Sequence, residues 1–374
     1  MTKIIAIICE FNPMHMGHKH VIDEARSKVG WDGVVMCVMS GNFTQRCTPA
    51  IYDKYTRARA ALACGADLVV ELPFPWSCAG AEDFARGGVS TAVGMGADSL
   101  LFASESGKRE LIEAAARVKA SDEYRARIIE AEKSDRELGS AVIFDSVMCE
   151  LGVTEPLGAN DKLGSEYVRF GREMGICEFY VIPRIRDLKS ATEVRSIIFD
   201  KRLNEARDDI PAEAYGIFAD TEICREERFV GLMFDFLRLT DPSFTEDPIV
   251  RYAMRVARES ASSREFAESL ATKKYTAARM RREILFSMLG VDASTVKQNT
   301  LHTVLLAAND RGRAYLSEIR KMLDFPIITK PADDSALDES SRESYRKLCR
   351  ADELYSLLVG REAGYFMKKH PEFV

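Results

Sequence analysis

Three of the five histidines in this chain, His15, His18 and His20, lie within six residues of one another. His15 and His18 are about one helical turn apart, so both imidazoles can approach one phosphate and stabilise the charge that develops when it is attacked. Gly17 leaves the backbone between them without a side chain, so a nucleotide can come close. The chemistry indicated is adenylyl transfer, in which an acid attacks the α-phosphate of ATP and pyrophosphate leaves.

Two other interpretations of the histidines stay open on the sequence alone. Paired imidazoles could ligate a metal ion, but such a site usually needs three or four ligands. His20 would face away from His18 on a helix and is a poor third ligand. The histidines could also do no more than cap a helix.

A second segment carries groups that suit a phosphate. Ser190 and Thr192 come after an apolar run at residues 178–182, at a point where a helix is expected to begin. A hydroxyl residue is a typical helix N-cap. Their hydroxyls and the amides of the first turn can bind phosphate, and Arg195 can neutralise a departing pyrophosphate. The alternative is an ordinary N-cap beside a surface arginine.

The elements that must position these residues alternate between apolar runs and amphipathic stretches. Buried strands are predicted at residues 3–9, 33–39, 67–71, 99–103 and 178–182, and helices at 17–27, 52–64, 82–95 and 109–119. This alternation indicates an α/β, Rossmann-like open parallel sheet covered on both faces. Such sheets bind ligands at the carboxyl ends of their strands, where both phosphate-binding segments fall.

Sequence patterns typical of strands become rare beyond about residue 200. Helices are predicted there at residues 229–239, 248–258, 276–288, 301–308, 314–323 and 341–359. We therefore divide the chain into an ATP-binding catalytic domain, residues 1–200, and a mainly α-helical C-terminal domain, residues 201–374. The stretch 121–175 is less regular and holds a loop at 158–161.

The composition is that of an ordinary globular protein. The chain has 374 residues, of which 46% are hydrophobic and 29% charged, and a net charge of −6, which excludes disorder, a fibrous repeat and overall basicity. The apolar run at the start of the sequence is short and soon followed by Glu10, which does not fit a secretory signal. No apolar run reaches the ~18–20 residues of a membrane span. Nine cysteines without a C-x-x-C pair favour neither a disulfide framework nor a zinc ribbon. We therefore expect a cytoplasmic protein.

One segment is basic although the net charge of the whole chain is negative. Residues 251–285 carry nine Lys and Arg against four Glu, with Tyr252 and Tyr275 among them. Basic side chains interleaved with aromatic ones suit phosphate contacts and stacking on a base. The alternative is a solvated helix face with ion pairs four residues apart.

Together, the histidine motif and the late Ser/Thr–Arg motif resemble the HIGH-type nucleotidyltransferase superfamily, and the match extends to one family. Residues 10–18, E-F-N-P-M-H-M-G-H, closely resemble the signature E-Y-N-P-F-H-N-G-H of the bacterial tRNA(Met) cytidine acetate ligases. Further segments follow in the family's order at residues 39–46, 67–73, 84–87, 102–107, 190–192 and 274–276. The resemblance is collinear over most of residues 1–290.

The resemblance implies a specific reaction. Members of this family use ATP to activate acetate as acetyl-adenylate, with release of pyrophosphate. They then transfer the acetyl group to the wobble cytidine of elongator tRNA(Met), which gives N4-acetylcytidine. The expected partners are therefore acetate and elongator tRNA(Met), with Mg²⁺ accompanying the triphosphate, and no membrane or protein partner is predicted.

The resemblance also implies where the substrates bind. The expected ATP-binding run is Ile8, Cys9, Glu10, Phe11, Asn12, Pro13, Met14, His15, Met16, Gly17, His18, Lys19, His20 and Val21. By the same resemblance, Ala103, Asn160 and Arg184 are further expected ATP contacts. From the chemistry of the residues given above, we also expect Ser190 and Thr192 to contact ATP, and His15, His18 and Arg195 to be the catalytic residues. The resemblance favours tRNA at the basic segment, through Lys273, Lys274, Tyr275, Arg279, Arg281 and Arg282.

The chain departs from the family pattern at several positions. Ala103 and Cys47 each replace a glycine, Asp161 replaces the second of two asparagines, and Met14 and Met16 replace Phe and Asn. These are the changes of a divergent member. Two alternative functions are an adenylyl- or cytidylyltransferase for a small metabolite, which usually lacks a basic helical second domain, and a non-catalytic protein that binds ATP and RNA.

Overall fold

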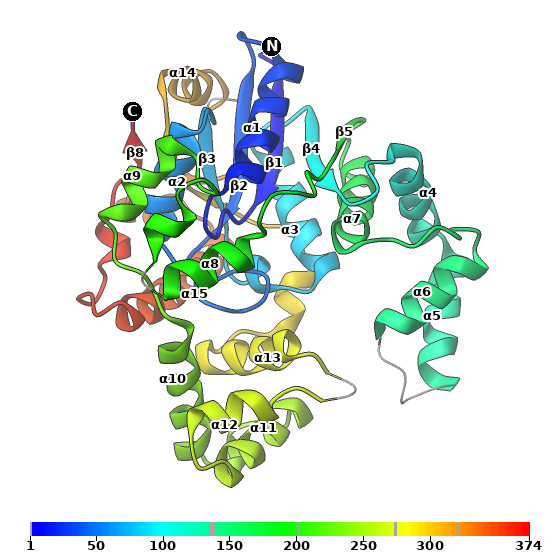
Figure 1. Ribbon diagram of the computed structural model, residues 1–374, viewed down its shortest axis with the longest axis vertical. Helices are drawn as coiled ribbons and strands as arrows, with labels where there is room; N and C mark the ends of the chain where they lie inside the picture. Colours follow the sequence, from blue (N-terminus) through cyan, green and yellow to red (C-terminus); the bar gives the residue numbers. More distant parts are fainter. Residues whose placement is uncertain (1, 135–139, 201, 273–274, 321) are drawn as a thin grey trace.

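A computed structural model gives the structure of the chain and describes every residue except 1, 135–139, 201, 273–274 and 321. Within the described residues, eight strands form one sheet in the order β5-β4-β1-β2-β3-β6-β7, with β8 pairing with β6 off this path (Figure 1). The strands are β1 (Ile4–Cys9), β2 (Val34–Ser40), β3 (Leu68–Leu72), β4 (Ser99–Ser104), β5 (Glu178–Pro183), β6 (Thr303–Ala308), β7 (Ile327–Ile328) and β8 (Glu372–Phe373).

The first five strands pair in parallel, and β1 lies between β2 and β4. The chain moves outward from β1 through β2 to β3, and then returns to place β4 on the other side of β1. This reversal makes the crevice between the carboxyl ends of β1 and β4 the switch point where open α/β sheets bind ligands. The predicted α/β class with a mostly parallel sheet is confirmed.

Helices connect and cover the strands. They are α1 (Met16–Val29), α2 (Lys54–Ala63), α3 (Ala81–Gly94), α4 (Arg109–Ala120), α5 (Asp122–Ser134), α6 (Ser140–Glu150), α7 (Ala159–Glu173), α8 (Ala191–Phe199), α9 (Ala212–Ala219), α10 (Glu226–Leu239), α11 (Pro248–Glu259), α12 (Ser263–Ser269), α13 (Ala277–Leu289), α14 (Asp310–Ile319) and α15 (Glu339–Leu358). Because the β3–β4 connection reverses direction, right-handed crossovers place α1 and α3 on opposite faces of the sheet. The central strands are therefore covered on both sides, and every residue of β2 and β3 is buried. None of the described helices has the length and apolar character needed to cross a bilayer.

Two parts of the predicted element order are wrong. Residues 301–308 hold β6 rather than a helix, and β6 runs antiparallel to β3 with all six residues buried. A short run that is apolar throughout has no periodicity that separates a buried strand from a buried helix. The stretch 121–175 holds α5, α6 and α7, and the predicted loop at 158–161 contains the first turn of α7.

The C-terminal part of the chain is mainly helical, as predicted, but it also contributes to the sheet. Strands β6, β7 and β8 extend the sheet beyond β3, and α14 packs against β2, β3 and β6. Helices α10 to α13 lie together below the sheet in Figure 1. The division at residue 200 stays a prediction.

A buried ion cluster joins the C-terminal helix to the sheet. The Nζ of Lys54, at the start of α2, lies 2.7 Å from Glu71 Oε2 on β3 and 2.6 Å from Asp352 Oδ2 on α15. All three side chains are buried. Burial alone would lower the pKa of Lys54, but the two carboxylates raise it well above its usual value, so the lysine stays charged.

We expect Lys54→Met to lower the free energy of unfolding by about 3–5 kcal/mol, because it leaves two carboxylates buried together without their cation. Urea unfolding measures the change. The matched control is Lys108→Met, which breaks the exposed 2.6 Å ion pair with Glu155, where such a pair contributes less than about 1 kcal/mol. Equal decreases in the free energy of unfolding for the two variants would contradict a structural role for the buried cluster.

Candidate active site

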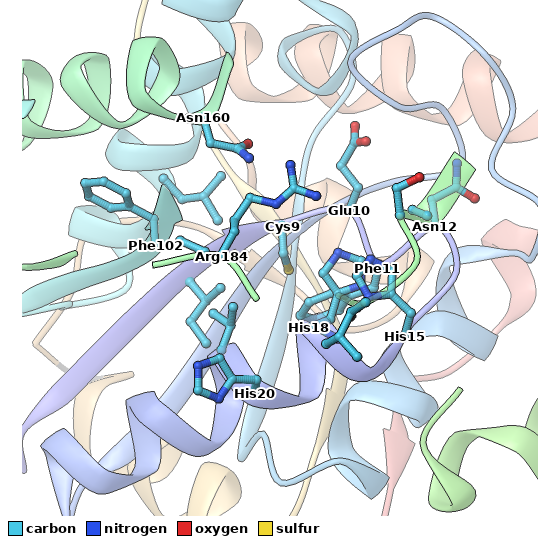
Figure 2. A pocket seen from close by; sticks show the side chains of 18 of the residues that line it. Cys9, Glu10, Phe11, Asn12, His15, His18, His20, Phe102, Asn160 and Arg184 are labelled. Carbon is cyan, nitrogen blue, oxygen red and sulfur yellow. Dashed lines mark hydrogen bonds between the residues drawn. The ribbon is translucent and has the colours of Figure 1, made fainter. Parts of the chain in front are cut away.

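A cavity of about 360 Å³ opens at the carboxyl ends of β1, β4 and β5, at the switch point of the sheet (Figure 2). Its walls come from the loop after β1, the start of α1, the end of β4, the first turns of α7, the loop after β5 and the start of α8. The predicted residues that line it are Ile8, Cys9, Glu10, Phe11, Asn12, His15, Gly17, His18, His20, Val21, Ala103, Asn160, Arg184, Ser190, Thr192 and Arg195.

The loop after β1 fixes the position of the histidines. Phe11 has a positive φ of 47° and a side chain that is almost fully buried, so the chain turns sharply at the end of the strand. Asn12 Oδ1 accepts a hydrogen bond from the backbone N–H of Ile51, 2.8 Å away. These two anchors place His15 at the N-cap of α1.

The two predicted catalytic histidines stack on each other. Their ring centroids lie 3.7 Å apart with the planes inclined by 26°. His15 Nδ1 accepts a hydrogen bond from the backbone N–H of Gly17 at 3.0 Å. A Cβ at residue 17 would lie 2.9 Å from His15 Cε1, so glycine here makes room for the imidazole itself.

Burial keeps both imidazoles neutral. Burial, and then the positive charge of the nearby Arg184, lower the pKa of His15 to about 4. Burial, and then the neighbouring His15, hold the pKa of His18 well below its usual value. Because Nδ1 of neutral His15 accepts from Gly17, its proton resides on Nε2, which is therefore a hydrogen-bond donor.

A carboxylate network aligns the wall formed by β4, β5 and α7. Glu105 Oε2 accepts from the backbone N–H groups of Asn160 and Asp161, at 2.9 and 3.1 Å, and so caps α7. Glu105 Oε1 accepts from Asn160 Nδ2 at 3.0 Å and lies 3.5 Å from Arg184 Nη1. A Cβ at Gly158 would lie 2.5 Å from Glu105 Oε2, so only glycine admits this cap.

The start of α8 joins the loop after β1 through an arginine. Arg195 Nη1 donates to the carbonyl oxygen of Asn12, and Nη2 donates to Thr192 Oγ1 at 3.0 Å. Ser190 is the N-cap of α8, since its hydroxyl accepts from the N–H of Glu193 at 3.3 Å. The serine therefore does form the ordinary N-cap weighed above, and it lines the cavity as well.

Comparison with known proteins places this arrangement in a family. Residues 2–369 match the family described as HIGH Nucleotidyl Transferase. A protein of Thermotoga maritima named tRNA(Met) cytidine acetate ligase is 32% identical over 357 residues, which cover 86% of this chain and 85% of that one. This chain belongs to the tRNA(Met) cytidine acetate ligase family. The predicted family is thus confirmed.

Other members of the family agree along the whole chain. A tRNA(Met) cytidine acetate ligase of Limosilactobacillus reuteri is 29% identical over 407 aligned positions, which cover 100% of this chain and 99% of the relative. The crystal structure of Thermotoga maritima TmcAL bound with alpha-thio ATP superposes with a TM-score of 0.89 at 27% identity, over 100% of both chains. The apo form of that protein superposes equally well.

Four residues of the expected ATP-binding run lie outside the lining of the cavity in this family member. Pro13, Met14, Met16 and Lys19 do not line it. Met14 is fully buried in the core, and Lys19 pairs with Asp23 one turn along α1, with 2.6 Å between Nζ and Oδ1. For these positions, ATP contact stays a prediction.

Sequence reasoning also missed part of the wall. The residues concerned are Ile7, Gln45, Phe84, Phe102, Leu163, Tyr167, Pro183, Ile185, Leu188, Lys189 and Ala191. Gln45, Phe84, Phe102 and Ala191 lie inside segments that resemble the family, so the resemblance could have identified them. Most of the others are apolar, and an apolar residue on a cavity wall has the same sequence pattern as one in the core.

The lining does not form a metal site. Among the described residues, no three His, Cys, Asp or Glu side chains gather closely enough to hold a metal ion. Glu10 is the one carboxylate among the described lining residues, and Figure 2 shows His20 apart from His15 and His18. The residues therefore do not fit a resident Mg²⁺, and any such ion would be bound mainly by the phosphates of the nucleotide.

The basic segment lies around α11 to α13. Arg279 lies over the ring of Tyr275, 4.8 Å from its centroid. Arg282 Nε donates to the carbonyl oxygen of Cys78 at 2.6 Å, and Arg281 Nε donates to that of Arg46 at 3.3 Å. Two arginines predicted to bind tRNA are thus partly engaged by protein carbonyls. Lys273 and Lys274 lie outside the described residues.

Proposed function

We propose that this chain activates acetate with ATP as acetyl-adenylate and then acetylates the wobble cytidine of elongator tRNA(Met). The observation that carries the proposal is the stacked, neutral pair His15 and His18 inside one cavity with Arg184 and Arg195. The names of the relatives support the reaction, and the relative bound with alpha-thio ATP supports the nucleotide. The compartment we expect is the cytoplasm.

The first step follows from charge. Acetate and the triphosphate are both anionic, so acetyl-adenylate formation needs cations and oriented donors rather than a strong base. The Nε2–H of His15 and the two arginines supply these groups at the α-phosphate and at the departing pyrophosphate. If Mg²⁺ enters with ATP, it adds positive charge on the phosphates.

The second step starts from an acyl donor that is already activated. Acetyl-adenylate is a mixed anhydride, and the attacking cytidine amine is neutral. Holding the two in the right geometry can supply much of the acceleration. The family resemblance and the basic helices α11 to α13 support tRNA as the molecule that delivers this amine.

One incubation separates the proposal from its alternatives. The protein is mixed with ATP, labelled acetate and tRNA from the same source, and the tRNA nucleosides are analysed for N4-acetylcytidine. We expect label in the wobble cytidine together with AMP and pyrophosphate. A nucleotidyltransferase for a small metabolite would leave the tRNA unlabelled, and a non-catalytic protein would release no pyrophosphate.

We expect the double variant Arg255→Gln, Arg279→Gln to weaken tRNA binding and to reduce the slope of log affinity against log salt by about 1 per residue. Both arginines lie over tyrosine rings, Arg255 over Tyr252 at 5.1 Å, so each pair combines a positive charge with an aromatic ring. The matched control is Arg117→Gln, on the distant helix α4. An unchanged salt slope in the double variant would refute this tRNA surface.

A further inference from the structure

Acetyl transfer releases a proton that needs an acceptor. When the N4 amine of cytidine attacks the acetyl carbonyl carbon, an N–C bond forms. The C–O bond to the phosphate breaks, and its electron pair leaves with AMP. One N–H proton must then leave the nitrogen, so the reaction is helped by a base within hydrogen-bond reach of that nitrogen.

Most titratable groups on the cavity wall cannot serve as that base. Nδ1 of His15 already accepts from Gly17 and its Nε2 carries a proton, so this imidazole donates. Burial lowers the pKa of His15 to about 4 and holds that of His18 well below its usual value, which makes both rings weak bases. Burial raises the pKa of Cys9 and of Tyr167 well above their usual values, so both keep their protons.

Glu10 has the chemistry and the position that the other groups lack. It follows β1 directly, lines the cavity, and lies between Arg184 and Asn12 in Figure 2. Its Oε1 accepts from the backbone N–H of Gln45 at 2.6 Å, which fixes the carboxylate. No hydrogen bond to Oε2 occurs from any residue that the structure describes, so this oxygen can accept one from substrate.

The surroundings of Glu10 make it a stronger base than an ordinary carboxylate. Burial raises the pKa of Glu10. The hydrogen bond from the backbone of Gln45 and the charges of Arg57, Arg195 and Arg46 lower it, but burial has the larger effect, so the pKa lies above its usual value. The arginines keep their charge at any pH of interest, and Cys9 and Tyr167 keep their protons. Among these groups, Glu10 is therefore the one that gains a proton on acidification.

We propose that Glu10 is the general base of acetyl transfer and takes the N4 proton of cytidine onto Oε2. The inference rests on the proposed function and adds a residue to its second step. Protonated Glu10 returns the proton to water once AMP and the acetylated tRNA leave. The carboxylate thus ends each cycle as it began, and no further reactant is needed.

The test supplies preformed acetyl-adenylate and tRNA, so that transfer is measured without the first step. Glu10→Gln keeps an oxygen that can accept from Gln45 but removes the basicity. We expect transfer to fall on the order of 10²–10³-fold, and acetate-dependent exchange of pyrophosphate into ATP to fall much less. In the wild type, the transfer rate falls as pH drops through the pKa of Glu10, and Glu10→Gln loses this dependence.

Two further variants complete the test. Glu10→Asp keeps a carboxylate at a shorter reach, so transfer is slower but still falls on acidification. Glu213→Gln, an exposed glutamate on α9, leaves the rate and the pH profile unchanged. Transfer by Glu10→Gln at the wild-type rate, or with the wild-type pH profile, overturns the role of Glu10. A wild-type protein that makes no acetylcytidine from acetyl-adenylate overturns the proposed function as well.

Discussion

His18→Ala should suppress acetate-dependent exchange of labelled pyrophosphate into ATP by on the order of 10²–10³-fold. The imidazole of His18 stacks on that of His15 with 3.7 Å between the centroids, and the ring centroid of Phe11 lies 5.1 Å from that of His18. The substitution removes one ring from the phosphate-binding wall and leaves His15 without the surface that fixes its orientation. Two groups that act on the α-phosphate are therefore affected by one change.

The matched control for this loss is His370→Ala, which removes an exposed imidazole outside the cavity and should leave exchange unchanged. His18→Asn is informative as well, because its amide restores a polar side chain near the same place, and we expect part of the rate to return. If His18→Ala exchanges pyrophosphate as fast as the wild type, the imidazole pair has no part in adenylate formation.

The histidine motif allowed the site to be placed from the sequence, because its position depends on local rules. A parallel strand followed by a helix puts the connecting loop at the carboxyl edge of the sheet, and the apolar run of β1 together with Gly17 was enough to recognise that geometry. The family resemblance then supplied Asn160 and Arg184, which lie on distant elements. No spacing rule connects those two residues with His15.

The remaining features of the site could not be predicted because they depend on tertiary contacts. Glu105 aligns Asn160 and Arg184 from the loop after β4. The segment 102–107 resembles the family, but nothing in it shows which residues the carboxylate of Glu105 contacts. The strand at 303–308 was missed for a related reason. Its apolar side chains are buried by the edge of β3 and by α2, and nothing within the segment shows that an antiparallel partner is present.

Nucleotide approach at Gly17 stays a prediction, and the structure adds a second reason for a glycine at this position. The sequence suggested that a residue without a side chain lets the nucleotide approach. In the structure, the space that a Cβ would occupy is limited by the ring of His15, 2.9 Å away. The glycine thus permits the N-cap geometry in which Nδ1 of His15 accepts from the backbone N–H of Gly17.

Arg195→Met should reduce pyrophosphate exchange by on the order of 10²-fold. The arginine joins the two phosphate-binding segments, since its guanidinium donates to the carbonyl of Asn12 and to Thr192 Oγ1. Methionine keeps the volume of the stem but loses both the charge and the link between α8 and the loop after β1. We therefore expect a higher KM for ATP together with a lower kcat.

Arg195→Lys separates the effect of the positive charge of Arg195 from the effect of the hydrogen bonds that join α8 to the loop after β1. An ammonium group restores the positive charge but cannot make the forked pair of hydrogen bonds, so we expect an activity between those of the wild type and Arg195→Met. Arg186→Met, which removes an exposed arginine outside the cavity, is the matched control. If lysine and methionine give equal activity, the charge of Arg195 contributes nothing at the transition state and its role is confined to joining α8 to the histidine loop.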